Sequence, residues 1–258
     1  MKILGIIQAR MSSIRLPSKV LLDLEGITVL EHVIERVKLA KMIDEVIVAT
    51  TIKKEDLKIV EICNNIGIKS FCGSEKDVLD RYYQVTKLYK TKHIVRITAD
   101  CPLIDPRVID KVIKLHLKEK VDYTTNTLKE TFPDGEDVEI FIFEALNKAW
   151  QNAKLLSERE HVTPYIRKHP KIFKLRNLEC DKNLSNKRWT LDNPEDYEFI
   201  KVIYKNLYVK NHLFGIVEIL EFLNKNPEIE TINQQIKRNE GYLRSLKSDR
   251  VQREYGDK

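Results

Sequence analysis

The sequence predicts an α/β protein in which a mostly parallel central sheet is flanked by helices. Short apolar runs of the kind found in buried strands alternate with helical segments through the first half of the chain. This alternation is typical of a parallel sheet. Because no repeat, linker or low-complexity tract interrupts the 258 residues, we expect one α/β domain over residues 1–212. Residues 213–258 are predicted to form a helical C-terminal extension that packs on this domain or at a dimer interface, with its last residues frayed.

Strands and helices are predicted in alternation through the first half of the chain. The strands are four short apolar runs at residues 2–8, 45–50, 68–72 and 93–98. Thr28 and Glu31 form a capping box that begins the first helix, which reaches Leu39. The next two helices are predicted over residues 54–65, ended by Gly67, and over residues 77–89. Asp105 caps a fourth helix whose first residue is Pro106.

The second half of the chain is less regular. Its apolar runs predict strands at residues 138–143, 172–178 and 188–191. Ser157 and Glu160 have the spacing of a capping box and predict another helix. Asn193 with Pro194 begins a helix that runs to about Leu207, and the chain beyond Phe214 is predicted to be helical.

The composition of the chain indicates the cell compartment and the class of ligand to be expected. The longest early apolar run, residues 3–7, is too short for a membrane span of ~20 residues or for a secretory signal, so we expect a cytoplasmic protein without a membrane partner. The net charge of +6 suits a nucleotide or another small anion but falls short of a nucleic-acid-binding surface. Four cysteines without C-x-x-C spacing indicate reduced thiols rather than disulfides or zinc.

The loop after the first strand carries an unusual density of phosphate-binding groups. Ligands of parallel sheets bind at the carboxyl ends of the strands, which here are residues 9–19, 73–80 and 99–105. Within residues 9–19, three cations and three serines occur together. Arginine binds phosphate oxygens in bidentate fashion, lysine acts as a point charge, and small serines let backbone N–H groups face an anion. The alternative is a solvated basic loop at the sheet edge.

Two aspartates are placed to hold a cation. Asp100 directly follows the fourth strand, and Asp192 follows a short predicted strand and precedes a helix. Carboxylates from separate strand ends can share one Mg²⁺ that is also bound to phosphates. Asp105 is better explained as a helix cap, and Asp196 falls in a first helical turn, where the helix dipole favours a carboxylate.

These motifs resemble those of the cytidylyltransferase family, which includes acylneuraminate and ketodeoxyoctonate cytidylyltransferases. Residues 9–19 are similar to the family's A-R-x-x-S-x-R-L-P-x-K motif. Asp100-Cys-Pro-Leu resembles its D-x-P-L metal site, and residues 191–196 resemble its second acidic motif. The similarity is greatest to the spore-coat polysaccharide biosynthesis branch, because residues 73–82, 134–139 and 159–163 also match.

The resemblance implies a GT-A-like, Rossmann-like nucleotidyltransferase fold that uses CTP and Mg²⁺. It implies transfer of CMP from CTP to a sugar, sugar acid or sugar-like phosphate, with release of pyrophosphate, in surface polysaccharide or glycoconjugate biosynthesis. The catalytic residues it implies are Arg10, Arg15, Lys19, Asp100 and Asp192, the last two as metal ligands. The nucleotide-binding residues are Ala9, Arg10, Ser12, Ser13, Arg15, Lys19, Gly73, Ser74, Asp77, Arg81, Thr98 and Ala99.

The acceptor is expected to be small and anionic, and the enzyme to be a homodimer. The residues predicted to line the acceptor pocket are Asn126, Asp134, Asp137, Glu139, Glu160, His161 and Arg188. Two of these have a structural alternative, since Asp134-Gly135 also suits a hairpin turn and His161 a buried structural histidine.

Three other functions remain open at this point. One is a nucleotidyltransferase that uses another nucleoside triphosphate. Another is a GT-A glycosyltransferase, although Asp100-Cys-Pro lacks the second aspartate of a D-x-D motif. The third is a nucleotide-sensing or nucleic-acid-binding protein, which gives no reason for Asp100 and Asp192 to accompany the basic loop.

Overall fold

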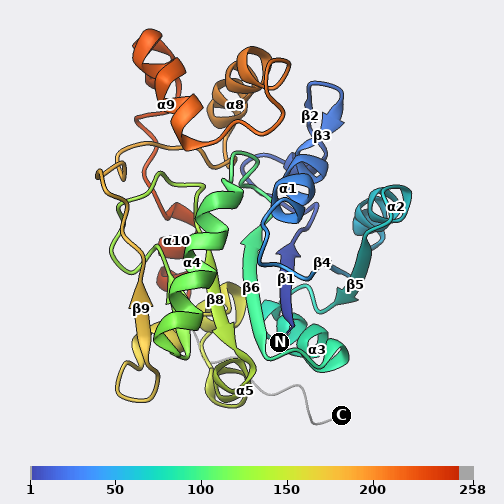
Figure 1. The fold of residues 1–258 in the computed structure, drawn as a ribbon. Helices are drawn as coiled ribbons and strands as arrows, with labels where there is room; N and C mark the ends of the chain where they lie inside the picture. Colours follow the sequence, from blue (N-terminus) through green and yellow to red (C-terminus); the bar gives the residue numbers. More distant parts are fainter. Residues whose placement is uncertain (1, 250–258) are drawn as a thin grey trace.

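A computed structural model of the chain describes residues 2–249 (Figure 1). Its centre is a seven-stranded sheet in the order β5-β4-β1-β6-β8-β7-β9. The first four strands in this order are parallel: β5 (Lys69–Gly73), β4 (Glu45–Thr51), β1 (Ile3–Gln8) and β6 (His93–Thr98). The other three are β8 (Glu139–Ile142), β7 (Tyr123–Thr125) and β9 (Leu175–Asn177). β8 runs antiparallel to β6 and β7, and β9 runs parallel to β7. The α/β class with a mostly parallel sheet is therefore confirmed.

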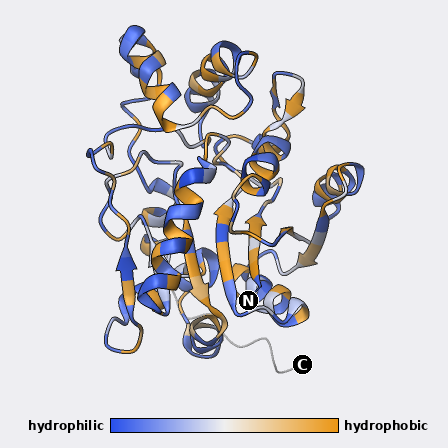
Figure 2. Ribbon diagram, in the orientation of Figure 1, coloured by the Kyte–Doolittle hydropathy of each residue, from blue (hydrophilic) through white to orange (hydrophobic). Residues whose placement is uncertain are grey.

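Both faces of the sheet are covered by helices, which explains the uninterrupted apolar strands (Figure 2). Alternate residues of β1 enter two separate cores, Ile3 and Ile7 on one face and Leu4 and Ile6 on the other. The first core is closed by α1 (Val29–Lys38), α2 (Leu57–Asn65) and α4 (Pro106–Glu119). The second is closed by α3 (Val78–Tyr89), α5 (Phe143–Asn152) and α7 (Pro164–Lys168).

A third core lies beyond the carboxyl ends of the strands. There, α8 (Pro194–Leu207) packs on α9 (Ile216–Lys225) through buried side chains that include Ile203, Phe214 and Ile219. The 3₁₀ helix η3 (Pro227–Ile232) adds Ile229 and Ile232 to this core. Residues 213–232 therefore pack against the α/β domain, whereas the predicted boundary at residue 212 stays a prediction. The frayed end predicted for the last residues falls largely on residues 250–258, which lie outside the described part of the chain.

Most predicted elements are present, with helix ends set by the predicted caps. The Thr28 hydroxyl accepts the Glu31 amide and the Glu31 carboxylate accepts the Thr28 amide, so the capping box of α1 is complete. The Asp105 carboxylate accepts the Arg107 amide at 2.8 Å, which confirms Asp105 as the cap of α4. The predicted helix over residues 54–65 is divided into a 3₁₀ turn, η2 (Lys54–Asp56), and α2.

Several local predictions were wrong. Residues 188–191 are extended but form only a single bridge, between Arg188 and Asp134, instead of a strand. Ser157 does not cap a helix: α6 (Leu156–His161) begins one residue earlier, and the Ser157 hydroxyl donates to Asp249. The strand predicted at 172–178 shrinks to β9. Strand β7 and a small hairpin of β2 (Asp23–Leu24) and β3 (Ile27–Thr28) were not predicted.

Gly135 permits the close crossing of two segments that build the site. Its φ is +108°, and an added Cβ would lie 2.6 Å from the backbone of both Trp189 and Thr190. We expect Gly135→Ala to lower the free energy of unfolding by about 2–3 kcal/mol, because backbone strain and overlap add. Gly26, whose φ is +91° with open space around it, separates the two effects. Chemical denaturation that finds Gly135→Ala no worse than Gly26→Ala would contradict the close crossing.

Among residues 2–249, no helix is both long enough and apolar enough to cross a membrane.

Candidate active site

Lys19, Asp100 and Asp192 meet at the carboxyl end of the sheet. Lys19 begins the 3₁₀ helix η1 (Lys19–Leu21), Asp100 follows β6 and Asp192 precedes α8. The Lys19 ammonium lies 2.6 Å from Asp100 Oδ2, 2.7 Å from Asp192 Oδ1 and 2.8 Å from the Leu191 carbonyl oxygen. The two carboxylates therefore converge on one point although 92 positions separate them in the sequence.

The charges in this cluster stabilise one another. Burial would raise the pKa of Asp100, but the Lys19 ammonium outweighs burial and lowers the pKa of that carboxyl to about 2. Burial opposes the charge of Lys19 as well, yet Asp100 and Asp192 together raise the pKa of Lys19 above its ordinary value. Asp100 and Lys19 are therefore both charged at neutral pH.

The loop that carries the other cations is shaped by Asp56. Its carboxylate is fully buried and accepts the Met11 amide at 2.7 Å. Arg15 extends from this loop to Asp192 Oδ2, at 2.7 Å, and to Glu240 Oε2, at 3.4 Å. Arg10 is exposed and reaches Glu160 at 3.4 Å. The loop thus presents Arg15 beside the carboxylate pair and Arg10 beside Glu160.

The first part of this loop contains three predicted nucleotide-binding residues, Ala9, Ser12 and Ser13. The Ala9 amide donates to the Ala49 carbonyl oxygen, so the chain leaves β1 in register with β4. The Ser13 hydroxyl accepts the Leu16 amide at 3.4 Å. The Ser12 hydroxyl is buried and has no hydrogen-bond partner among residues 2–249.

The loop between β5 and α3 is bound by the buried side chain of Arg81. The Arg81 guanidinium is buried and donates to the Ser74 carbonyl oxygen at 2.6 Å. Asp77 caps α3 by accepting the Asp80 amide at 2.8 Å and also accepts Arg159 Nε at 2.9 Å. A side chain at Gly73 would press on Arg81 at 3.0 Å. The hydrogen bonds of Arg81 and Asp77 therefore fix the conformation of this loop.

Thr98 and Ala99 lie at the very end of β6. The Ala99 amide donates to the Gln8 carbonyl oxygen at 3.0 Å, which ties the β6 end to the β1 end. The Thr98 hydroxyl lies 3.3 Å from Cys101 Sγ. The two residues place Asp100 directly opposite the loop that follows β1.

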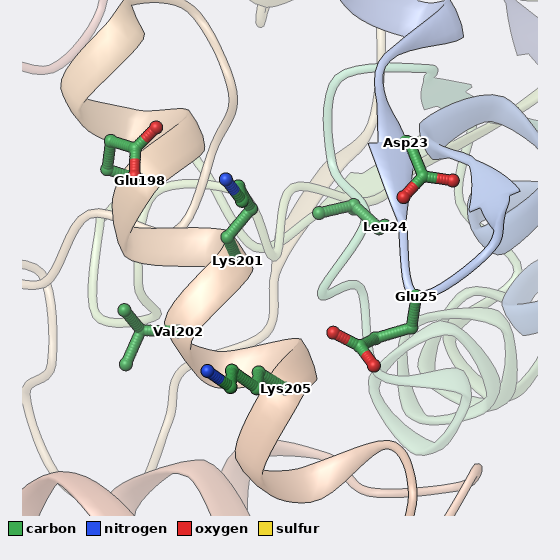
Figure 3. A pocket seen from close by; sticks show the side chains of 7 residues that line it. All are labelled: Asp23, Leu24, Glu25, Glu198, Lys201, Val202 and Lys205. Atoms are coloured by element: carbon green, nitrogen blue, oxygen red, sulfur yellow. The ribbon is translucent and has the colours of Figure 1, made fainter.

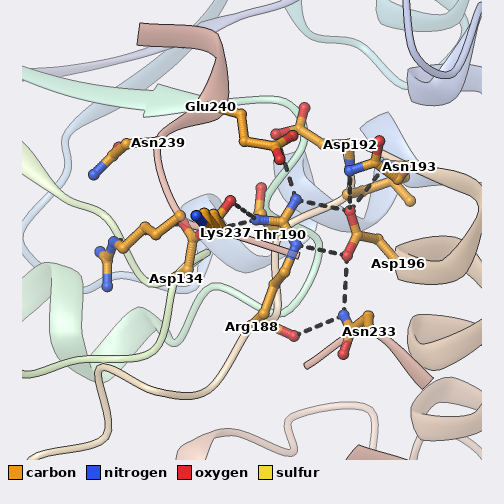
Figure 4. A network of polar contacts seen from close by, with 12 residues as sticks. Asp134, Arg188, Thr190, Asp192, Asn193, Asp196, Asn233, Lys237, Asn239 and Glu240 are labelled. Atoms are coloured by element: carbon orange, nitrogen blue, oxygen red, sulfur yellow. Dashed lines mark hydrogen bonds and ion pairs between the residues drawn. The ribbon is translucent and has the colours of Figure 1, made fainter. Parts of the chain in front are cut away.

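A buried ion network continues from Asp192 toward the predicted acceptor residues (Figure 4). The Arg188 guanidinium donates to Asp134 Oδ2 at 2.9 Å and to both carboxylate oxygens of Asp196, at 2.8 and 2.9 Å. It also lies 3.7 Å from Asp192. Asn233 donates to Asp196 at 3.0 Å from the far side. Asp196 therefore holds the Arg188 guanidinium in place and also accepts the Asp192 amide at 3.0 Å.

Arg238 closes the other end of this network. It donates to Asp137 at 2.6 Å and to the Phe132 carbonyl oxygen at 3.0 Å, and it lies 3.8 Å from Asp134. Burial and the neighbouring Asp137 raise the pKa of Asp134 to about 7, although two arginines oppose the shift. Asp134 and Asp137 thus form a carboxylate pair between two arginines.

The remaining predicted acceptor residues divide into buried and accessible groups. Asn126 is fully buried, and its side-chain amide binds the backbone of Glu136 and Val138. Glu139 is also buried and binds Arg96, Tyr123 and Thr163. The Asn126 and Glu139 side chains therefore bind groups of the protein itself. Glu160 and His161 lie on α6, where both contact the Ser245 hydroxyl, at 2.9 and 3.0 Å.

His161 is neutral at physiological pH. Burial lowers the pKa of its imidazole to about 4; Glu160 opposes this shift, and Arg96, Arg167 and Arg10 add to it. Because the unfolded chain takes up this proton near pH 6.5, His161 makes stability fall as the pH drops from about 6.5 toward 4.

We expect this dependence to be lost in His161→Gln. Between pH 7 and pH 5, the wild type should lose about 2 kcal/mol more stability than the variant does. Urea unfolding at the two pH values measures the difference. An exposed His212→Gln variant is the control, and equal pH dependence in all three proteins would place His161 in ordinary contact with solvent.

Several polar residues around the site were not predicted from the sequence. Arg238, Asn239 and Glu240 come from the C-terminal extension, and Arg96 comes from β6. An arginine inside the buried strand HIVRIT was an available signal, because a buried arginine needs an acidic partner. The extension offered no such signal, since it reads as an exposed polar helix.

A separate hollow lies between the β2–β3 hairpin and α8 (Figure 3). The residues that line it are Asp23, Leu24, Glu25, Glu198, Lys201, Val202 and Lys205. It contains none of the predicted site residues.

Comparison with known proteins decides the family. The family model described as cytidylyltransferase matches residues 4–219. The chain belongs to the cytidylyltransferase family. The resemblance of the sequence motifs is thereby confirmed, and with it a CTP-dependent nucleotidyltransferase that transfers CMP and releases pyrophosphate. Members of this family generally use a divalent metal ion, and CTP and a sugar acceptor fit the family.

Full-length relatives support the same assignment for this cytidylyltransferase. It is 46% identical over 239 residues to an uncharacterized protein of Methanocaldococcus jannaschii, covering 92% of this chain and 96% of that protein. It is 35% identical over 241 residues to the spore coat polysaccharide biosynthesis protein SpsF of Bacillus subtilis, covering 89% and 97%. The solved structure of a cytidylyltransferase from Leptospira borgpetersenii is 37% identical, with a TM-score of 0.87, and covers 92% of this chain and 100% of that one.

Proposed function

We propose that this cytidylyltransferase transfers CMP from CTP to an anionic sugar, a sugar acid or a sugar phosphate, for surface polysaccharide synthesis. The observation that carries the proposal is the convergence of Asp100, Asp192 and Lys19, with Arg15 beside them. The similarity to a spore coat polysaccharide biosynthesis protein supports the polysaccharide context.

The residues present fit a Mg²⁺ ion. Two carboxylates point at one place and supply the hard oxygen ligands that Mg²⁺ prefers. No cluster of three or more His, Cys, Asp or Glu residues suited to a metal occurs within residues 2–249. Mg²⁺ is commonly held by one or two carboxylates together with substrate phosphates. Asp100 and Asp192 would hold the ion, which would supply a positive charge beside the reacting phosphate.

Arg10, Arg15 and Lys19 are proposed to bind the triphosphate. Their positive charges neutralise the charge that grows on pyrophosphate as it leaves, while an acceptor oxygen attacks the α-phosphorus in line. The Lys19 ammonium already makes three contacts, to Asp100, Asp192 and the Leu191 carbonyl oxygen, so binding a phosphate requires it to release one of them. The β5–α3 loop, with Gly73, Ser74, Asp77 and Arg81, is proposed to contact or position the cytidine.

The acceptor is proposed to bind on the side of Glu160, His161, Asp134, Asp137 and Arg188. The carboxyl groups of Glu160, Asp134 and Asp137 suit the hydroxyl groups of a sugar, because a carboxyl group accepts hydrogen bonds when ionised and can also donate one when protonated. Arg188 and Arg10, which reaches Glu160, are the cations beside these groups that can bind an anionic group. The buried residues Asn126 and Glu139 are proposed to hold the segments that line this acceptor site.

Nucleotide binding tests the assignment. Calorimetric titration with Mg²⁺ should show tighter binding of CTP than of ATP, GTP or UTP. Arg15→Ala should weaken CTP binding roughly tenfold to a hundredfold, since a charge-assisted hydrogen bond contributes ~1.5–3 kcal/mol. It should weaken CMP binding less, because CMP lacks the outer phosphates. Equal affinity for all four triphosphates would remove the cytidine assignment, and pyrophosphate release across a panel of sugar acids and sugar phosphates identifies the acceptor.

A further inference from the structure

The C-terminal extension makes buried contacts up to Asn233 and lies on the surface beyond Arg238. Up to that residue it is anchored to the domain, since the partly buried Ile229 and Ile232 pack against the third core and the buried Asn233 side chain donates to Asp196 and the Arg188 carbonyl oxygen. Residues 238–249, here called the strap, include α10 (Glu240–Lys247), in which no residue is buried. The family model ends at residue 219, before the strap.

The strap lies across residues that the proposed function assigns to both substrates (Figures 1 and 4). At its start, Arg238 binds Asp137 at 2.6 Å. Glu240 then meets Arg15 at 3.4 Å, on the triphosphate side. One helical turn further, Ser245 binds both Glu160 and His161 on the acceptor side. Polar contacts thus join the strap to the two halves of the site.

We propose that the strap is a displaceable gate, in which the Glu240 carboxylate takes the place of a substrate phosphate on Arg15. The proposal rests on the proposed function for the role of Arg15. Phosphate binding and the Glu240 contact exclude each other for two reasons. They use the same guanidinium, and the Glu240 carboxylate repels the like charge of a triphosphate. Phosphate binding therefore releases Glu240 and loosens α10.

The strap can open at little cost in free energy. A helix of eight residues is marginal by itself in water. No residue of α10 is buried and Leu243 is half exposed, so the apolar area that holds α10 down is small. Its Tyr242 ring contacts the His161 ring edge-on, with 5.1 Å between the centroids, and lies under the Arg167 guanidinium. The ion pair between Arg15 and Glu240 is partly exposed to solvent, and such pairs contribute little. Segments with few buried apolar contacts open first.

Hydrogen exchange of the full-length protein tests the gate. We expect amide exchange in residues 240–247 to become faster when pyrophosphate or CTP binds. In Glu240→Gln, exchange of α10 should already be faster without any ligand, and pyrophosphate and CTP should each bind roughly two- to fivefold more tightly than to the wild type. Glu221→Gln, which makes the same charge change at an exposed position of α9, should match the wild type.

The outcomes separate the gate from the nucleotide assignment. If pyrophosphate loosens α10 but CTP binds no better than other triphosphates, the cytidine assignment fails and the gate stands. If α10 becomes protected when either ligand binds, the strap clamps the substrate and the proposed displacement is overturned. Unchanged exchange together with equal affinity in Glu240→Gln and Glu221→Gln would also overturn it.

Discussion

Asp100→Asn and Asp192→Asn are each expected to lower the rate of CMP transfer by roughly 10²–10⁴-fold while the protein stays folded. Asparagine keeps the shape of the side chain but loses the charge with which a carboxylate holds a divalent cation. The two aspartates face one point, so neither is expected to replace the other. Because each also binds the Lys19 ammonium, we expect a modest fall in melting temperature.

Pyrophosphate release as a function of Mg²⁺ concentration checks this expectation. Asp181→Asn is a suitable control, since it removes the same charge from an exposed position. The wild type and the control should saturate together, whereas the two site variants should remain slow at high Mg²⁺. Losses below tenfold in both site variants would show that the convergence on Lys19 is only a structural ion pair.

Arg188→Met is expected to lower the free energy of unfolding by about 3–5 kcal/mol. The side chain of Arg188 is 5% exposed and that of its partner Asp196 is fully buried. Methionine leaves the Asp196 carboxylate without a cation, and Asp134 loses its closest one. A buried carboxylate without a partner is costly, because burial disfavours its charged form.

Thermal unfolding and a double-mutant cycle measure this network. A loss of that size corresponds to a fall of roughly 10 °C in melting temperature. Adding Asp196→Asn to Arg188→Met should recover part of the loss, since the uncompensated charge is then gone. Arg176→Met, at an exposed ion pair with Glu119, should change stability by less than about 1 kcal/mol. Full additivity of the two buried substitutions would contradict the ion network.

The elements that sequence reasoning found are those whose signals are local. Strands β1, β4 and β6 are continuous apolar runs because both of their faces are buried. Helices α4 and α8 begin with a capping residue followed by proline. Strand β7 was not predicted because it has only three residues, and its place between β8 and β9 is set by distant segments.

The residues of the site likewise divide into those with a local signal in the sequence and those whose role depends on distant segments. The motif residues Arg15, Lys19, Asp100 and Asp192 could be named from the sequence because each follows or precedes a recognisable element. That Lys19 bridges the two aspartates could not be foreseen, because the contact joins residues 81 and 173 positions apart. The buried roles of Asn126 and Arg81 likewise depend on the folded backbone around them. The sequence motifs indicate which residues are candidates for the site, whereas the packing of the folded chain decides which of them can face a substrate.

The dependence of Asp196 and Arg188 on Asn233 has a consequence during protein synthesis. The four parallel strands are all complete by Thr98, so the nucleotide half of the sheet can form while the rest of the chain is still being translated. The network that steadies Asp192 needs Asn233, which the ribosome adds on the order of ten seconds later. A nascent chain can therefore carry a folded sheet before it carries a finished active site.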